Sequence, residues 1–254
     1  MEWKNKVAIV TGSSAGIGKA TKELLRQKGA TVYNLDHNTP NQEDANFIFC
    51  EVSKKEDINN AIDQVLEKEK RIDLLFANAG VHLFATLEET SYEQLESMVG
   101  INVLGTYYLL KKVVPIMKQQ KKGSIVLMGS DQVFIGKASS SVYGMTKAAI
   151  GQLAKSTAID YAPYNIRVNC ICPGTINTPL LHRAVEQFVA KTRTAADEVY
   201  RSLEAVQPMG RVGKAEEIAH SVPSCCPMRA TTGSLFAVDG EYTCQGEIVK
   251  QFFL

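Results

Sequence analysis

The sequence has little that would suggest a metal centre, a membrane anchor or a nucleic-acid partner. Its four histidines and six cysteines do not form the Cys-x-x-Cys pairs or the His and Cys spacings of zinc sites. No apolar stretch approaches the roughly 18 residues that a membrane-spanning helix requires. Lys and Arg number 28 against 27 Asp and Glu, so the net charge of +1 predicts no basic surface for nucleic acid or an anionic membrane.

The first residues, Met1 to Lys6, lack the apolar core of a signal peptide. The cysteines show no disulfide framework, and reduced thiols are typical of cytosolic proteins. We therefore expect a cytoplasmic protein. Its 254 residues, of which 45% are hydrophobic, suffice for one large α/β domain or two small ones.

Short β-branched runs alternate with amphipathic segments along the whole chain, without a change in composition between them. This alternation predicts an α/β fold, a Rossmann-type doubly wound parallel sheet of about seven strands with helices on both faces. We expect a single domain, 1–254. The expected strands are 6–10, 31–35, 47–52, 72–76, 124–128, 166–171 and 234–239, and the expected long helices are 16–28, 55–70, 92–118 and 143–161.

Two late segments depart from this regular alternation. Residues 180–207 are polar and helical in character, and they follow a strand at the sheet edge where ligands bind in such folds, so we expect a substrate lid there. A plain surface helix pair is the alternative. Pro223 falls inside the next helix, where it removes a hydrogen bond, so we expect that helix to end near His220 or to be kinked.

A glycine-rich turn, Thr11 to Gly18, follows the first strand and opens the first helix. Glycines let the backbone approach a pyrophosphate, and the helix N-terminus favours its charge. A tight connection without a ligand is the alternative. Asp36 ends the second strand, where a carboxylate can bind the adenosine ribose and would repel a 2′-phosphate. Neither Ser13 nor His37 offers a strong cation, so NAD is favoured over NADP.

Tyr143 and Lys147 lie four residues apart, one above the other on a helix, with Ser130 thirteen residues upstream of Tyr143. A cation one turn away favours the phenolate and is expected to lower the pKa of Tyr143. A tyrosine tuned in this way can exchange a proton with a substrate oxygen, which Ser130 would hold from a separate strand end. The pair alone also occurs by chance in many helices.

Taken in order, these motifs resemble the short-chain dehydrogenase/reductase family of the classical type, over residues 5 to 243. Besides the glycine turn and the Ser, Tyr and Lys set, the matching motifs are Asn78-Ala79-Gly80, Asn102 within Ile-Asn-Val, and Pro173-Gly174 with Thr178. The resemblance implies that Tyr143 is the general acid/base, that Lys147 lowers its pKa and binds the nicotinamide ribose, and that Ser130 binds the substrate oxygen. Asn102 would hold a water in a proton relay, or merely satisfy helix carbonyls.

The same resemblance implies a nicotinamide cofactor, NAD rather than NADP, and no metal. It assigns cofactor contacts to Gly12, Ser14, Gly16, Ile17, Gly18, Asp36, Glu51, Val52, Asn78, Ala79, Gly80, Tyr143, Lys147, Pro173, Gly174, Ile176 and Thr178. It also implies a homo-oligomer, a tetramer or a dimer. Glu241, where the family commonly has glycine, weakens the tetramer, and the tail 245–254 could tuck into a neighbouring subunit or fray.

The substrate is expected to be a small polar molecule such as a sugar, a sugar acid or a hydroxy acid. Asp131 and Gln132 would line the pocket and favour hydroxyl groups, and a carboxylate could bind Arg183, Lys137 or His182. No Arg stands just before Tyr143, unlike in hydroxybutyrate-type members. The leading prediction is an NAD-dependent oxidoreductase acting on a secondary alcohol or ketone. The alternatives are a cofactor-binding sensor or scaffold without activity, and an epimerase or dehydratase, which would need a longer substrate domain.

Overall fold

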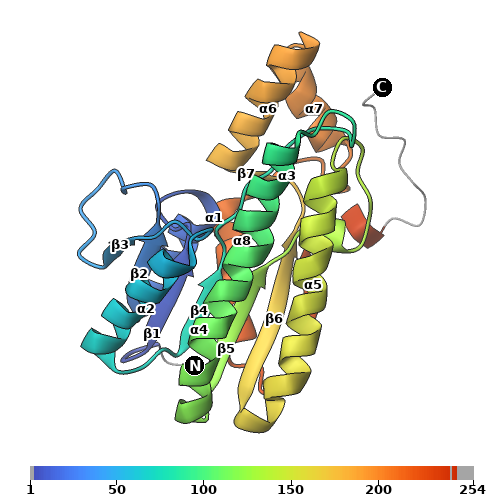
Figure 1. Cartoon of the computed structure of the whole chain (residues 1–254). Coiled ribbons are helices and arrows are strands. Elements are labelled where there is room, and N and C mark those ends of the chain that lie inside the picture. The colour runs from blue at the N-terminus through green and yellow to red at the C-terminus, as the bar shows by residue number, and fades with distance from the viewer. Residues whose placement is uncertain (1–2, 241, 245–254) are drawn as a thin grey trace.

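Seven parallel strands form one sheet in the order β3-β2-β1-β4-β5-β6-β9 (Figure 1). The computed structural model describes residues 3–240 and 242–244. The strand order reverses between β1 and β4, so the connections that leave these two strands run in opposite directions. A crevice forms between them at the carboxyl edge of the sheet. The fold predicted from the sequence is therefore confirmed. The strands are β1 (Val7–Thr11), β2 (Thr31–Asp36), β3 (Phe47–Phe49), β4 (Leu74–Ala77), β5 (Gly123–Met128), β6 (Ile166–Pro173) and β9 (Leu235–Val238).

Helices cover both faces of the sheet (Figure 1). One face carries α2 (Lys55–Glu69), α4 (Gly105–Gln120) and α5 (Ser141–Tyr161), and the other carries α1 (Gly16–Gln27) and α8 (Ala215–Cys225). Successive strand residues point to opposite faces, and they divide accordingly between two hydrophobic cores. Val7 and Ile9 of β1 join the core under α2, α4 and α5, whereas Ala8 and Val10 join the core under α1 and α8.

The predicted helix over 92–118 is not one continuous α-helix. It is divided into α3 (Tyr92–Val99), a π-helical turn η1 (Gly100–Leu104) and α4. The π turn holds one extra residue, which helices accommodate mostly where a side chain must be redirected. Here Gly105 lies so close to the turn after β3 that a Cβ would stand 2.9 Å from the Val52 carbonyl oxygen. Pro115, in contrast, lies on the exposed side of α4 and does not end it.

Residues 180–207 do form a helix pair, α6 (Pro179–Thr192) and α7 (Ala196–Ala205), which rises beyond the carboxyl edge of the sheet (Figure 1). The pair has a small core of its own, separate from the two cores of the sheet, made by Leu181, Val185, Val199 and Leu203. The short strand β7 (Ile176–Asn177) precedes the helix pair in the sequence and β8 (Gly213–Lys214) follows it, and the two strands pair with each other.

The predicted early end of α8 is wrong, because the helix continues through Pro223 to Cys225. Pro223 is close to the end of the helix, so it removes a single backbone bond, and the burial of Val222 and Cys225 beside it offsets that loss.

Glu241 and the tail 245–254 lie outside the described residues. Within residues 3–240 and 242–244, no helix has the length and apolar character needed to cross a membrane.

A buried charge cluster fixes the loop between β2 and β3 to helix α1. Asp44 in this loop accepts hydrogen bonds from Lys22 Nζ at 2.8 Å and from Arg26 at 2.6 Å, and its side chain is 4% exposed. Burial raises the pKa of Asp44, but the hydrogen bonds from Arg26 and Lys22 outweigh it and lower the pKa to about 2. The cluster therefore holds the loop that follows Asp36 in place.

We expect Asp44→Ala to lower the free energy of unfolding by ~3–5 kcal/mol, because it leaves the buried Lys22 charge without its partner. Urea denaturation measures this change. Since the pKa of Asp44 is lowered on folding, its stabilisation is present above pH ~4 and is lost as the pH falls toward 2. Asp63→Ala, which breaks an exposed pair with Lys112, is the control and should cost ~1 kcal/mol or less. Equal losses in the two variants would contradict this account.

Candidate active site

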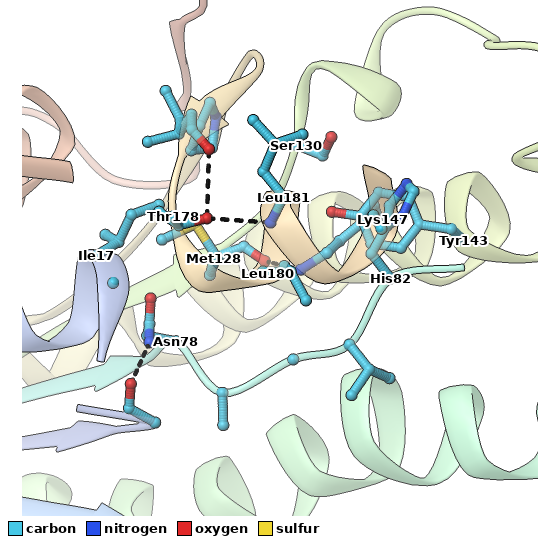
Figure 2. A pocket seen from close by; sticks show the side chains of 18 of the residues that line it. Ile17, Asn78, His82, Met128, Ser130, Tyr143, Lys147, Thr178, Leu180 and Leu181 are labelled. Carbon is cyan, nitrogen blue, oxygen red and sulfur yellow. Dashed lines mark hydrogen bonds between the residues drawn. The ribbon is translucent and has the colours of Figure 1, made fainter. Parts of the chain in front are cut away.

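A cavity of about 440 Å³ opens at the carboxyl edge of the sheet. Its walls come from the segments that follow β1, β2, β4, β5 and β6, and from α5, α6 and α7. Figure 2 shows Ile17 and Asn78 at one end of this cavity and His82, Tyr143 and Lys147 gathered at the other. The cavity is therefore long enough to bring the glycine turn and the proposed acid/base residues into one site.

The glycine turn lies against the end of β4 without room for side chains. The Asn78 amide donates to the carbonyl oxygens of Thr11 at 2.9 Å and Gly12 at 3.2 Å. A Cβ on Gly12 would lie 2.9 Å from Ala79 Cα, and Gly12 has a positive φ of 64°. Ala15 gives the first turn of α1 no side-chain cap, so its backbone N–H groups stay available to a phosphate. The turn is therefore open to a pyrophosphate, and the binding of one stays a prediction.

Asp36 occupies the position expected for a ribose-binding carboxylate. It lines the cavity, and it accepts hydrogen bonds from the backbone N–H groups of Ser14 and Asn38, both at 2.9 Å. The Ser14 hydroxyl turns away and donates to the Asn38 carbonyl oxygen. These two bonds fix the Asp36 carboxylate in the wall of the cavity.

Ser130 and Tyr143 meet at the other end of the cavity. Ser130 follows β5 with extended backbone, and its hydroxyl accepts from the Gln132 N–H at 3.2 Å. It is also close enough to Tyr143 to favour the phenolate and so lower the pKa of the phenol. Lys147, one turn along α5, has its Nζ 5.6 Å from the centre of the Tyr143 ring and donates to the Met128 carbonyl oxygen at 2.9 Å. The three predicted catalytic side chains thus line the same cavity, and their roles stay a prediction.

The expectation that Lys147 lowers the pKa of Tyr143 is not met in this structure. Burial raises the pKa of Tyr143 above its usual value, the charge of Asp131 raises it further, and the bond with Ser130 only partly opposes them. Burial also lowers the pKa of Lys147 to about 8, so its positive charge is itself costly there. Lys147 lies beside the ring and bonds a backbone carbonyl, so the loss of solvent around the phenol outweighs the cation.

Asn102 lies in the π turn and does not line the cavity. Its side-chain amide accepts from the Val81 N–H at 2.9 Å and donates to the Val81 carbonyl oxygen at 3.0 Å. It also donates to the Thr146 hydroxyl on α5. Asn102 therefore joins the loop after β4 to the helix that carries Tyr143, and it does not satisfy helix carbonyls. The proposed role of Asn102 in holding a water for a proton relay stays a prediction.

Sequence reasoning missed His82, which stands two residues after the Asn-Ala-Gly motif. Its ring contacts those of Phe84 and Tyr143, each with ring centres 4.4 Å apart, and its Nδ1 has no partner among the described residues. Burial lowers the pKa of His82 to about 4, and the charges of Lys137 and Lys147 add to this. His82 is therefore neutral at pH 7. A polar residue just after a glycine motif at a strand end was the signal available.

The predicted substrate contacts have different outcomes. Lys137 and Arg183 line the cavity, but His182 does not and instead bonds Asn177 Oδ1 at 2.7 Å. Gln132 lines the cavity and donates to the Ser140 hydroxyl. Asp131 is almost fully buried, with both carboxylate oxygens engaged inside the protein by Ser130 and Lys137. It is thus oriented toward protein groups rather than toward substrate hydroxyls.

Most of the predicted cofactor residues share this one cavity. Ser14 and Gly18 do not line it: Ser14 supports Asp36, and Gly18 packs against the Gly12 carbonyl oxygen and the Asn78 amide. The described residues hold no cluster of three metal-ligating side chains. The predicted residues that line the cavity are Gly12, Gly16, Ile17, Asp36, Glu51, Val52, Asn78, Ala79, Gly80, Ser130, Tyr143, Lys147, Pro173, Gly174, Ile176 and Thr178.

Known proteins resemble the chain along nearly its whole length. The family model described as enoyl-(acyl carrier protein) reductase matches residues 12–243. An uncharacterized oxidoreductase of Thermotoga maritima is 34% identical over 256 residues, which cover 96% of this chain and 99% of the relative. L-fucose dehydrogenase of Bos taurus is 31% identical, with coverage of 85% and 81%. The ligand-free aldohexose dehydrogenase of Thermoplasma acidophilum is 32% identical, with a TM-score of 0.90 and 97% of each chain covered.

Two further solved structures were determined with different nicotinamide cofactors. ElxO, 26% identical with a TM-score of 0.84, has NADP bound and is covered over 99% of its length. The 3-ketoacyl-(acyl-carrier-protein) reductase of Brucella melitensis, 25% identical with a TM-score of 0.85, is complexed with NADH. These structures support a nicotinamide cofactor in this fold and leave the choice between NAD and NADP to the residues around Asp36.

We expect Gly18→Ala to weaken NADH binding at least tenfold, because the added Cβ would lie 2.3 Å from the Gly12 carbonyl oxygen and force the turn out of shape. Titration of NADH fluorescence measures the affinity, and a thermal melt reports the accompanying loss of stability. Gly136→Ala is the matched control, since no atom lies within 4 Å of its added Cβ. Unchanged NADH affinity in Gly18→Ala would contradict the proposed cradle.

Proposed function

Because this chain belongs to the short-chain dehydrogenase/reductase family, we propose that it is an NAD-dependent dehydrogenase that oxidises a secondary alcohol, or reduces the corresponding ketone, of a small polar substrate. The observation that carries the proposal is the meeting of Ser130, Tyr143 and Lys147 in the cavity that also contains the glycine turn. A sensor or scaffold without activity would have no need to keep these three groups together.

In the oxidation direction, the substrate hydroxyl lies between the Ser130 and Tyr143 oxygens. Tyr143 accepts the hydroxyl proton at its phenolic oxygen, while Ser130 holds the same oxygen by a hydrogen bond. A nicotinamide held in the same cavity would supply the acceptor for the hydride that leaves the carbon. Burial raises the pKa of Tyr143, so a nearby positive charge is needed to form the phenolate that accepts the proton. Lys147, next to Tyr143 on α5, is the cation in that position.

The residues around the cavity support these assignments for the cofactor. The N-terminus of α1 and Gly12 would hold the pyrophosphate, and Thr178, whose hydroxyl accepts from the Leu181 N–H, would lie by the nicotinamide (Figure 2). Asp36 supports NAD, because its fixed carboxylate would repel a 2′-phosphate. Val81 is held by Asn102, which keeps the strand end between the two halves of the site in place.

A sugar, a sugar acid or a hydroxy acid fits the substrate end of the cavity best. Two groups there can bind polar substituents: the unpartnered Nδ1 of neutral His82 and the guanidinium of Arg183. Lys137 also lines the cavity, but its ammonium is paired with Asp131. The bovine relative acts on L-fucose by name, and the Thermoplasma structure is of an aldohexose dehydrogenase, which supports the same class. The homo-oligomer expected from the sequence stays a prediction.

The test is NADH absorbance at 340 nm with NAD and a panel of sugars, aldonic acids, hydroxy acids and secondary alcohols. We expect turnover with at least one polar member, and a fall of ~10²–10⁴-fold in Tyr143→Phe, which cannot accept the proton. Tyr92→Phe, on an exposed tyrosine, is the control and should keep its activity. NADH binding without turnover on any substrate would instead support the inactive sensor.

We expect at least tenfold higher kcat/KM with NAD than with NADP. Asp36→Asn keeps the size of the side chain and removes its charge, so the preference for NAD should shrink. The same assay with both cofactors measures the ratio. Asp63→Asn, on the exposed surface of α2, should leave it unchanged. A ratio in Asp36→Asn equal to that of the unmodified protein would show that another group selects the cofactor.

A further inference from the structure

Directly behind the catalytic hydroxyls lies an ion pair that the mechanism above does not use. Ser130 donates its hydroxyl hydrogen to Asp131 Oδ1 at 2.9 Å, and Lys137 Nζ bonds Asp131 Oδ2. The Asp131 side chain is 2% exposed, whereas that of Lys137 is 21% exposed. A carboxylate so deeply buried is costly unless it is paired, and here its two partners are the catalytic serine and a lysine from the loop before α5.

The Ser130 hydroxyl has a single hydrogen, and two acceptors compete for it. When the Ser130 hydroxyl donates its hydrogen to Tyr143, it stabilises the phenolate. When it donates the hydrogen to Asp131 instead, the phenolate loses that stabilisation. The negative charge of Asp131 also faces the phenol and disfavours its ionisation. Lys137 neutralises that charge and so weakens both effects. Its ammonium is held over the Tyr242 ring, 4.7 Å from the ring centre.

We propose that the Asp131–Lys137 ion pair is a positioning unit, which sets where the Ser130 hydrogen points and what charge Tyr143 faces during proton transfer. This inference rests on the proposed function of Tyr143 as the general acid/base. Asp131 and Lys137 act through the catalytic hydroxyls, and neither needs to touch the reacting atoms.

The other charged or titratable groups near Tyr143 have different partners or positions. Lys147 bonds the Met128 carbonyl oxygen, and His82 is neutral at pH 7. The guanidinium of Arg183 is on α6, at the exposed side of the cavity. The titratable groups that line this part of the cavity are His82 after β4, Asp131 and Lys137 after β5, Lys147 on α5 itself, Arg183 on α6, and Tyr242 after β9, which lies against Lys137.

The two halves of the pair make opposite predictions. Asp131→Asn removes the negative charge and frees the Ser130 hydrogen, so the ionisation of Tyr143 should shift to lower pH by about 0.5–1 unit. Lys137→Met leaves the Asp131 charge uncompensated, so the ionisation should shift to higher pH. The double variant should lie between them. Alcohol oxidation of the substrate found by the panel gives a second readout, because Tyr143 must lose its proton before it can accept one. The rise of kcat with pH should therefore occur at lower pH in Asp131→Asn and at higher pH in Lys137→Met.

The ionisation is measured directly by NMR titration of protein labelled with ¹³C at the tyrosine ring carbon that bears the hydroxyl. The Tyr143 signal is assigned by its loss in Tyr143→Phe. This readout needs no substrate, so it tests the pair even if no member of the panel is turned over, whereas silence across the panel counts against the proposed function. Asp73→Asn, which weakens an ion pair at the opposite edge of the sheet, is the matched control.

Asp73→Asn should lower stability without moving the ionisation of Tyr143. If Asp131→Asn behaves in the same way, with lower stability and an unmoved titration, the pair is only structural and the proposal is overturned. A rise in KM for Lys137→Met with the titration and the kcat limb unmoved would also overturn it, because Lys137 would then bind substrate and not position the hydroxyls.

Discussion

The site depends on a close contact between two strand ends that are distant in sequence. Where the strand order reverses, the Asn78 amide donates to the carbonyl oxygens of Thr11 and Gly12, and the Thr11 hydroxyl accepts from the Asn78 and Ala79 N–H groups in return. These four bonds hold the turn after β1 against the turn after β4. The backbone can approach so closely only because Gly12 and Gly18 have no side chains there. The cofactor end of the cavity is shaped by this contact.

At the substrate end of the cavity, burial shifts the pKa values of three side chains. It raises the pKa of Tyr143 and lowers those of Lys147 and His82, so each of the three groups is biased toward its neutral form. With a pKa of about 8, Lys147 still carries a positive charge at pH 7. The charge near the phenol therefore comes from Lys147 and from the Asp131–Lys137 ion pair.

The sequence was sufficient for the sheet and for most of the cavity, because strand ends, glycines and periodicity are local signals. Thr11 to Gly18 and the spacing of Tyr143 from Lys147 could be recognised without knowing any distance. The π turn at Gly100–Leu104 could not, because the close approach of Gly105 to Val52 beside it involves another part of the chain. The raised pKa of Tyr143 and the pairing of Asp131 likewise depend on burial, which spacing alone does not report.

The separate core of α6 and α7 affects how such a protein can change over evolutionary time. Leu181, Val185, Val199 and Leu203 pack with one another and not with the sheet. Substitutions that reshape this wall of the cavity therefore leave the two large cores intact, and their cost in folding is confined to one helix pair. Ser130, Tyr143 and Lys147 lie outside this helix pair, after β5 and on α5. The shape of this wall can therefore change while those three groups stay in place.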